Sequence, residues 1–319
     1  MRIAVPPVIV AILLSGTSIA AAPKPPEPRL LVSPATDQPS AVQSDVVAAL
    51  RRVLSGDPRG RVDLASLAAS GRSDAQEALG ELLGPSGPKP LRDEVAACEW
   101  FQKASSMRAD SLHNLALCAE RGVRGAPDPA RAAALYRRAA ERGYAKSLCA
   151  LGNLYVAGKG VPKDEANGAA LCLRAAKRGE QDAQTDLGNM YLRGVGVSQD
   201  IVEARKWYEL AASQGQHNAE FTLGQIYWNG DGVARDQAKA AELWKKAFDG
   251  GRVDAAPLIA AWLFASWMSS HTRGDSTGLD EAIRYQEMAV TISPEGKRAD
   301  AEGLLTVMRT ARGMPDRAK

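Results

Sequence analysis

The hydrophobic positions of the chain repeat every 36 residues between residues 71 and 251. Each unit carries a leucine followed by a small residue, and a further small residue lies four positions before the leucine. In the units with the clearest pattern, a tyrosine lies four positions after the leucine. Positions four apart share one face of an α-helix, so each unit is predicted to begin with a helix that buries this face. The leucines are Leu79, Leu115, Leu151, Leu187 and Leu223.

The second half of each unit predicts a second helix that runs back along the first. A Gly-x-Gly-Val sequence, as at residues 194–197, ends the first helix because glycine tolerates left-handed backbone angles. An aspartate then caps the second helix, and Asp200 with Glu203 fits a capping box. Ala204 and Tyr208 give this helix an apolar face. A single hairpin cannot bury both faces alone, so the units are expected to stack.

These residues resemble the Sel-one-like repeat (SLR), a relative of the tetratricopeptide repeat with the pattern AxxxLGxxYxxGxGVxxDxxxAxxWYxxAAxxG. Residues 183–215 match this pattern nearly throughout, and residues 219–251 match it almost as well. The resemblance implies an all-α fold, a right-handed α/α solenoid of about five to six 36-residue helical hairpins with atypical capping helices.

The repeat positions predict how the chain is organised. The repeats are placed at residues 71–107, 108–143, 144–179, 180–215 and 216–251. We expect N-terminal helices at 40–70 as a cap, an altered sixth repeat at 252–293, and a C-terminal capping helix and tail at 294–319. Within the altered repeat, the loop 271–278 takes the place of the Gly-Val turn.

The first 22 residues are typical of a secretory signal peptide. Met1 and Arg2 give a positive start, residues 3–14 are apolar, and residues 15–22 are small and weakly polar. An uncleaved anchor is the alternative. A proline-rich linker is expected at 23–39, because its prolines disfavour helix and sheet. We therefore expect a secreted protein with no integral membrane span in the mature chain, and the resemblance to bacterial family members implies the periplasm.

The chain has four cysteines, and an even number in an exported protein indicates disulfides. Cys149 and Cys172 fall at similar heights on the two helices of one hairpin. Cys98 and Cys118 lie symmetrically about the turn between the first and second repeats. We predict the disulfides Cys98–Cys118 and Cys149–Cys172. Four reduced, buried thiols are the alternative, because a free cysteine is itself a good core residue.

Composition and motifs give little support for nucleic-acid binding, metal binding or cofactor chemistry. The 40 Lys and Arg residues nearly balance the 37 Asp and Glu residues, whereas a nucleic-acid binder usually carries a basic stripe or a strongly basic total. No CxxC spacing occurs, and His217 with Glu220 supplies too few ligands for a metal. No cofactor and no metal site are predicted.

The search for catalytic residues is equally negative. The histidines His113, His217 and His271 accompany no G-x-S-x-G sequence. Ser86 and Lys89 form an S-x-x-K sequence, but it lies in a turn rich in Gly and Pro and has no S-D-N or K-T-G partner. We therefore predict no catalytic residue.

The remaining candidate site is a surface. The resemblance implies that the first helices line a concave groove, so polar residues beside the leucine stripe are predicted to bind a partner. Trp228 is expected to be an exposed aromatic anchor. An ordinary solvated helix surface is the alternative. The predicted partner-binding residues are Asn114, Asn153, Asp186, Asn189, Arg193, Thr222, Gln225, Trp228 and Asn229.

From these observations the chain is predicted to be a non-catalytic scaffold or adaptor that binds a protein or peptide partner in the cell envelope. Two alternatives stay open. Some exported, cysteine-containing SLR proteins bind or hydrolyse β-lactams, so the resemblance implies a possible enzyme of that type. A module that binds peptidoglycan or another glycan is the other alternative.

Overall fold

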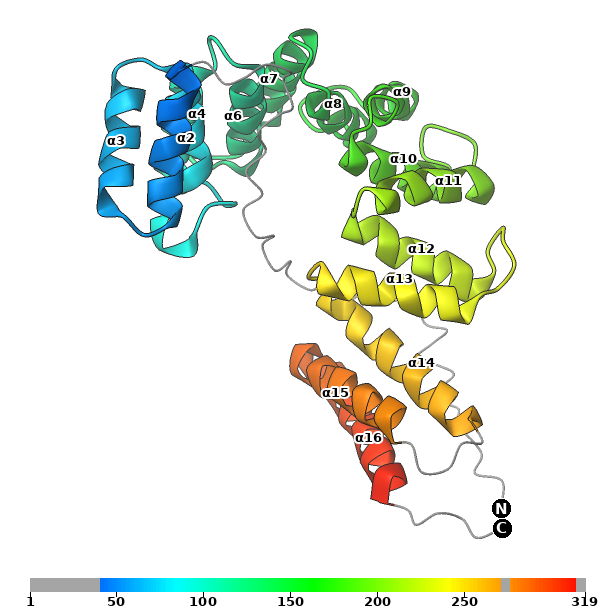
Figure 1. Cartoon of the computed structure of the whole chain (residues 1–319). Coiled ribbons are helices and arrows are strands. Elements are labelled where there is room, and N and C mark those ends of the chain that lie inside the picture. The colour runs from blue at the N-terminus through cyan, green and yellow to red at the C-terminus, as the bar shows by residue number, and fades with distance from the viewer. Residues whose placement is uncertain (1–40, 271–275, 314–319) are drawn as a thin grey trace, which may run out of the picture. The chain divides into compact units, whose positions relative to one another are not determined.

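The computed structural model describes residues 41–270 and 276–313. These residues form α-helices joined by short turns, and they contain no strand (Figure 1). The expected signal peptide (1–22) and proline-rich linker (23–39) lie outside the described residues, as do part of the expected loop (271–275) and the end of the tail (314–319). The described residues fall into two compact units, one that ends at Asp200 and one that begins at Ile201.

The N-terminal unit is a stack of helical hairpins. The pairs α2–α3, α4–α5, α6–α7 and α8–α9 each pack as a hairpin, and the last helix of each hairpin packs on the first helix of the next. A short 3₁₀ turn (Lys89–Leu91) lies between α4 and α5. The helices are α2 (Ala41–Leu54), α3 (Pro58–Ala69), α4 (Ser73–Leu83), α5 (Glu94–Ala104), α6 (Ala109–Arg121), α7 (Pro129–Glu141), α8 (Lys146–Ala157), α9 (Glu165–Ala176) and α10 (Gln181–Arg193).

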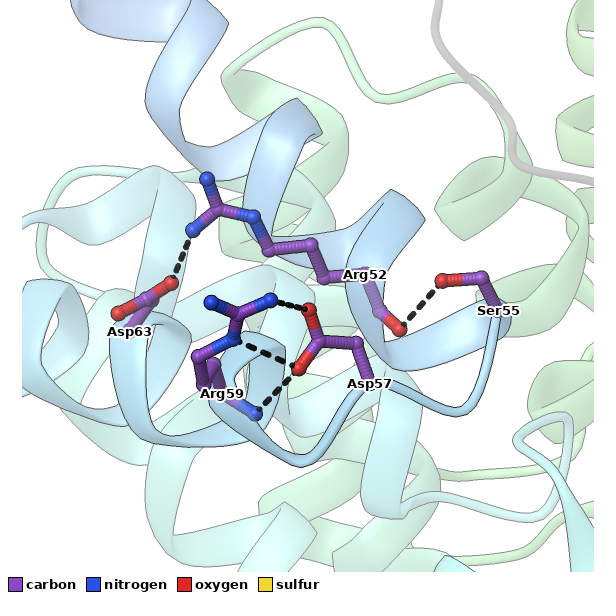
Figure 2. A network of polar contacts seen from close by, with 5 residues as sticks. All are labelled: Arg52, Ser55, Asp57, Arg59 and Asp63. Atoms are coloured by element: carbon purple, nitrogen blue, oxygen red, sulfur yellow. Dashed lines mark hydrogen bonds and ion pairs between the residues drawn. The ribbon is translucent and has the colours of Figure 1, made fainter.

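The hairpin α2–α3 is held at its turn by paired charges (Figure 2). Asp57 caps α3 by accepting from the backbone N–H of Arg59 at 3.0 Å, and the Arg59 guanidinium returns to the same carboxylate at 2.9 Å. Arg52 of α2 forms an ion pair with Asp63 of α3. The charges at this turn therefore neutralise one another within the hairpin.

Several helices begin at the aspartates or end at the glycines predicted from the repeat pattern. Asp128 accepts from the backbone N–H of Arg131 at 2.9 Å, and Asp164 caps α9 in the same way at 3.0 Å. The first helix of the best-matching repeats ends on a glycine in the left-handed region, such as Gly158 with φ of 64°. The capping role predicted for these aspartates and the helix-ending role predicted for the glycine are confirmed.

The leucine of each repeat lies in the core. All five are at most 4% exposed, and the large side chains opposite them on second helices are buried as well, among them Tyr136, Tyr208 and Trp244. The small residue after the leucine is needed for close packing. A Cβ at Gly224 would lie 2.5 Å from Trp244 Nε1, so only glycine allows this approach of α13 to α12.

Both predicted disulfides are present. Cys98 of α5 bonds to Cys118 of α6 with an S–S distance of 1.98 Å, which joins the first repeat to the second. Cys149 of α8 bonds to Cys172 of α9 at 2.05 Å, which closes one hairpin. The predicted pairing is confirmed.

The C-terminal unit is also a stack of consecutive helices. Each of its helices packs on the next, and α14 and α15 occupy the segment expected for the altered sixth repeat. Leu305 and Met308 of α16 are buried against this stack. The helices are α11 (Ile201–Ser213), α12 (His217–Asn229), α13 (Gln237–Asp249), α14 (Ala256–Ser269), α15 (Thr277–Ile292) and α16 (Glu295–Gly313), with a 3₁₀ turn at Val253–Ala255.

The predicted fold class, an all-α solenoid of stacked hairpins, is confirmed within each unit. Among the helices that the structure describes, none combines the length and apolar character needed to cross a bilayer.

Candidate functional site

A row of polar side chains connects the first helices of successive repeats in the N-terminal unit. Three hydrogen bonds form it. Asn114 Nδ2 of α6 donates to Glu77 Oε1 of α4 at 2.9 Å, and His113 Nδ1 of α6 lies 2.9 Å from Ser147 Oγ of α8. Asn153 Nδ2 of α8 donates to Asp186 Oδ2 of α10 at 2.8 Å. We call these residues the polar row: Glu77, His113, Asn114, Ser147, Asn153 and Asp186.

Glu77 is the most buried charge-bearing group of the row. It is 4% exposed, and its Oε2 has no hydrogen-bond partner in the part of the chain that the structure describes. Burial, and after it the negative charges of Asp110 and Glu81, raise the pKa of Glu77 to about 8. The guanidinium of Arg108 and the amide of Asn114 act in the opposite direction. Glu77 is therefore expected to be protonated near neutral pH, and its O–H adds a donor to the row.

His113 is a neutral imidazole held between aromatic rings. Its ring centroid lies 5.2 Å from that of Tyr136 and 5.1 Å from that of Tyr144. Burial lowers the pKa of His113 to about 4, and the positive charge of Lys146 adds to this effect. Its neighbour Ser147 has no exposed surface, so a substrate cannot reach the serine hydroxyl. The pair therefore serves packing between repeats and does not form a nucleophile with its base.

Asp186 lies beside the disulfide of the neighbouring hairpin. Its carboxylate is half-buried, and Oδ2 is 3.5 Å from Cys149 Sγ, which has no hydrogen to donate. Burial raises the pKa of Asp186, while the hydrogen bond from Asn153 counteracts part of this rise. The side chain of Asn153 is exposed to solvent. This amide can therefore hold Asp186 and still offer hydrogen-bonding atoms to a partner.

The other residues predicted to bind a partner differ in exposure. In the N-terminal unit, Asn189 is half-buried and Arg193 is exposed at the end of α10. In the C-terminal unit, Gln225 is exposed on α12. The structure therefore leaves Asn153, Asn189, Arg193 and Gln225 accessible on first helices.

Two more predicted residues on or near α12 bond within their own segment. Thr222 Oγ1 donates to the backbone oxygen of Asn218 at 3.1 Å. Asn229 Nδ2 donates to Asp231 Oδ2 at 3.0 Å. Both side chains keep surface in contact with solvent, but each has a partner inside the chain.

The expectation that Trp228 is an exposed anchor is wrong. The indole is 9% exposed, and its ring centroid lies 5.3 Å from that of Trp244. Arg235 covers it further, because its Cζ is 5.8 Å from the ring and its Nε donates to the Trp228 carbonyl at 2.9 Å. Trp228 is a core residue of the C-terminal unit and is not part of a binding surface.

Sequence reasoning did not single out Glu77 and did not place His113 in a site. The two residues are 36 positions apart and therefore occupy equivalent positions of successive repeats, directly before the column of Asn114. The signal that could have found them is a pair of ionisable residues in a column where the later repeats carry Cys149, Thr185 and Phe221.

The structure also places the residues of the two motifs considered for chemistry, Ser86 and His217. Ser86 lies exposed in the turn after α4. His217 Nδ1 is 2.9 Å from Glu220 Oε2, but no cluster of three or more His, Cys, Asp or Glu side chains placed to hold a metal exists among the described residues.

Comparison with known proteins gives one family match. The sequence matches the model of the Sel1 repeat at residues 73–108, 109–144, 145–180, 181–216 and 217–251, so the resemblance to the Sel-one-like repeat is confirmed. No curated protein matches the sequence.

Two solved structures are similar in fold. The first is a Sel1 repeat protein from Oxalobacter formigenes, with 24% identity, a TM-score of 0.59, and coverage of 77% of this chain and 96% of that chain. The second is c5321, a protective antigen present in uropathogenic Escherichia coli strains that displays an SLR fold. It shows 23% identity, a TM-score of 0.53, and coverage of 86% of this chain and 62% of that chain.

Proposed function

The chain belongs to the Sel1 repeat family, and we propose that it is an exported, non-catalytic scaffold or adaptor that binds a protein or peptide partner in the cell envelope. Sel1 repeat proteins commonly mediate protein–protein interaction. Family membership supports binding to a protein partner. The compartment, the absence of catalysis and the surface that binds are additional parts of this proposal.

The observation that carries the proposal is the set of accessible amides on first helices. Asn153, Asn189 and Gln225 lie at equivalent positions of successive repeats. A primary amide both donates and accepts hydrogen bonds, so Asn153 and Asn189, at repeat spacing within the N-terminal unit, suit the backbone of an extended peptide, and Gln225 offers the same group in the C-terminal unit. Each contact is weak because the groups are solvated beforehand, and affinity requires several of them together.

Export is supported by the cysteines and by the expected signal peptide. Disulfides persist in oxidising compartments such as the periplasm and are reduced in most cytosols. The chain has two of them and no free cysteine. Residues 1–22 carry the charged, apolar and small segments of a signal peptide.

A pull-down from crosslinked cell envelopes tests the proposal. Tagged wild-type chain is compared with Asn153→Ala/Asn189→Ala/Gln225→Ala. The control, Gln102→Ala/Gln237→Ala, removes amides carried by the second helices α5 and α13. We expect a partner that wild type and the control capture equally and that the triple variant loses.

The other results contradict the proposal in different ways. A partner captured equally by all three chains would place binding away from these three amides. No partner above the level of untagged cells would argue against a scaffold. Tagged chain found only in the cytosol, with residues 1–22 retained and the cysteines reduced, would argue against export.

A further inference from the structure

A shallow gap opens between α7, α8 and α9 in the N-terminal unit, with a volume of about 290 Å³. Leu148, Leu151 and Leu171 form its apolar floor. We call it the α7–α9 gap. Its rim is made of Arg137, Glu141, Tyr155, Asn167 and Arg174.

The two arginines of the rim are exposed and lack acidic partners. Neither Arg137 nor Arg174 forms an ion pair within residues 41–270 and 276–313. Arg137 Nη2 donates to Tyr155 Oη at 3.2 Å, so the phenol oxygen is used as an acceptor. No acceptor for the Tyr155 O–H is present among the described residues. The gap thus offers two guanidinium groups and one hydroxyl donor above an apolar floor.

Two repeats later, the chain surrounds the equivalent tyrosine with a carboxylate and a cation of its own. Glu209, Tyr227 and Lys239 occupy the positions equivalent to Arg137, Tyr155 and Asn167, each 72 residues further along. Tyr227 Oη donates to Glu209 Oε1 at 3.0 Å, and Lys239 Nζ donates to Tyr227 Oη at 2.7 Å. In the C-terminal unit, the tyrosine therefore has an acceptor carboxylate and a donor cation from its own chain.

We propose that the α7–α9 gap binds an acidic residue of a partner peptide, with the peptide carboxylate in the role that Glu209 plays beside Tyr227. Tyr155 would donate to this carboxylate, and the guanidinium groups of Arg137 and Arg174 would flank it. Arginine suits this task because its planar fork matches the geometry of a carboxylate.

The floor and the remaining rim residues limit which peptide sequences the gap can bind. An aliphatic side chain next to the acidic residue would rest on Leu148, Leu151 and Leu171. Asn167, which is exposed, can donate to or accept from the peptide backbone. Glu141 carries the negative charge of the rim, so a second carboxylate on that side is disfavoured. The gap therefore fits one acidic residue beside one aliphatic residue.

This site is separate from the polar row and does not rest on the proposed function. Leu151 faces the gap, whereas Asn153 belongs to the row. Leu151 and Asn153 are two residues apart in α8, so their side chains project from nearly opposite sides of this helix. A peptide in the α7–α9 gap would therefore leave the row accessible.

A designed swap tests the proposal with the purified, disulfide-bonded chain. Arg137→Glu/Asn167→Lys installs the residues that surround Tyr227, and it should close the gap with pairs that the chain already tolerates elsewhere. A displayed library of linear peptides is selected against wild type, and enriched peptides are measured by fluorescence polarisation. Arg138→Ala is the matched control, because it lowers the net charge of the chain by one, as the swap does, and Arg138 does not line the gap.

We expect the enriched peptides to carry an acidic residue beside an aliphatic one. The swap and Arg174→Ala should each weaken binding about tenfold or more, which matches the loss of one charge-assisted hydrogen bond. Changing the peptide Glu to Gln should cause a similar loss, and Arg138→Ala should cause none. Asn153→Ala/Asn189→Ala/Gln225→Ala should also leave peptide binding unchanged, which separates this site from the amides that carry the proposed function.

Three results would overturn the proposal: no enriched peptide, enriched peptides without acidic residues, or equal binding by wild type and the swap. Circular dichroism melting checks that the swap is folded. Should it unfold, Arg174→Ala decides, because Arg174 is exposed and its truncation leaves the core untouched.

Discussion

The side-chain amide of Asn153 donates a 2.8 Å hydrogen bond to Asp186, and this bond joins the first helix of one repeat to the first helix of the next. Burial makes the ionised form of Asp186 costly, and the amide offsets part of that cost. Asn153 therefore has two possible roles, one in stacking the repeats and one in binding a partner. The two roles can be separated by experiment.

Replacing Asn153 with Ala is expected to destabilise the N-terminal unit. The change leaves the half-buried Asp186 carboxylate without its amide donor, which costs about 1–2 kcal/mol. Gln225→Ala is the matched control, because Gln225 occupies the equivalent position two repeats later and is exposed. Urea unfolding followed by circular dichroism measures both. Equal stability of the two variants would show that the Asn153–Asp186 bond contributes nothing to stacking.

Glu77 is expected to make the N-terminal unit less stable as the pH rises. Its pKa in the folded chain, about 8, lies above the ordinary value of 4.5, so the folded state binds the proton more tightly than the unfolded state. The stabilising contribution of Glu77 is therefore complete below about pH 4.5, and this contribution is lost as the pH rises toward about 8. Glu77→Gln, which keeps the shape and cannot ionise, should remove this dependence.

Urea unfolding of wild type and Glu77→Gln at several pH values between about 5 and 8.5 measures this effect. The free energies of unfolding should converge near the low end of this range and diverge toward the high end, with the variant more stable. Parallel curves for the two chains would contradict the buried, protonated state of Glu77.

The fold was predictable from the sequence because each physical signal occurs in several repeats. Leucine, glycine and aspartate columns mark the buried face, the turn and the cap, and a doubtful unit can be placed from the register of its neighbours. The pairing of Cys149 with Cys172 was predictable for a related reason, since the turn between two antiparallel helices fixes which residues lie at equal height.

The candidate site was less predictable because its contacts join different repeats. His113 meets Ser147, and Asn114 meets Glu77, across 34 and 37 residues of sequence. Glu77 lies outside the repeat pattern, and the pattern requires only a small residue at Ser147, so it predicts no polar contact at either residue. The prediction for Trp228 was wrong for a different reason: its position at the end of a helix suggests exposure, but Trp244 and Arg235 of the same repeat cover it.

His113 is expected to act on stability in the opposite pH range. Its pKa in the folded chain, about 4, lies below the ordinary value of 6.5, so the unfolded state binds the proton more tightly. The contribution of this group is complete above about pH 6.5 and is lost as the pH falls toward about 4. His113→Phe should unfold with a weaker dependence on acid pH, although it loses the bond to Ser147. His217→Gln, at the half-buried histidine of α12, serves as the control. An unchanged acid dependence in His113→Phe would contradict the prediction.

Removing the disulfide between Cys98 and Cys118 is expected to lower the free energy of unfolding by about 3 kcal/mol, because the bridge closes a loop of 20 residues in the unfolded chain. Cys149→Ala/Cys172→Ala opens a loop of 23 residues and should cost nearly the same if loop entropy decides the effect. Alanine is preferred to serine because a buried hydroxyl would add its own cost. Urea unfolding under oxidising conditions compares the two double variants with wild type.

The two variants distinguish two effects of the bridges. If Cys98→Ala/Cys118→Ala loses much more free energy of unfolding than Cys149→Ala/Cys172→Ala, the bridge between the first and second repeats also holds these hairpins together in the folded chain. If both variants are as stable as wild type, and reductant leaves wild type unchanged, the disulfides do not stabilise the stack.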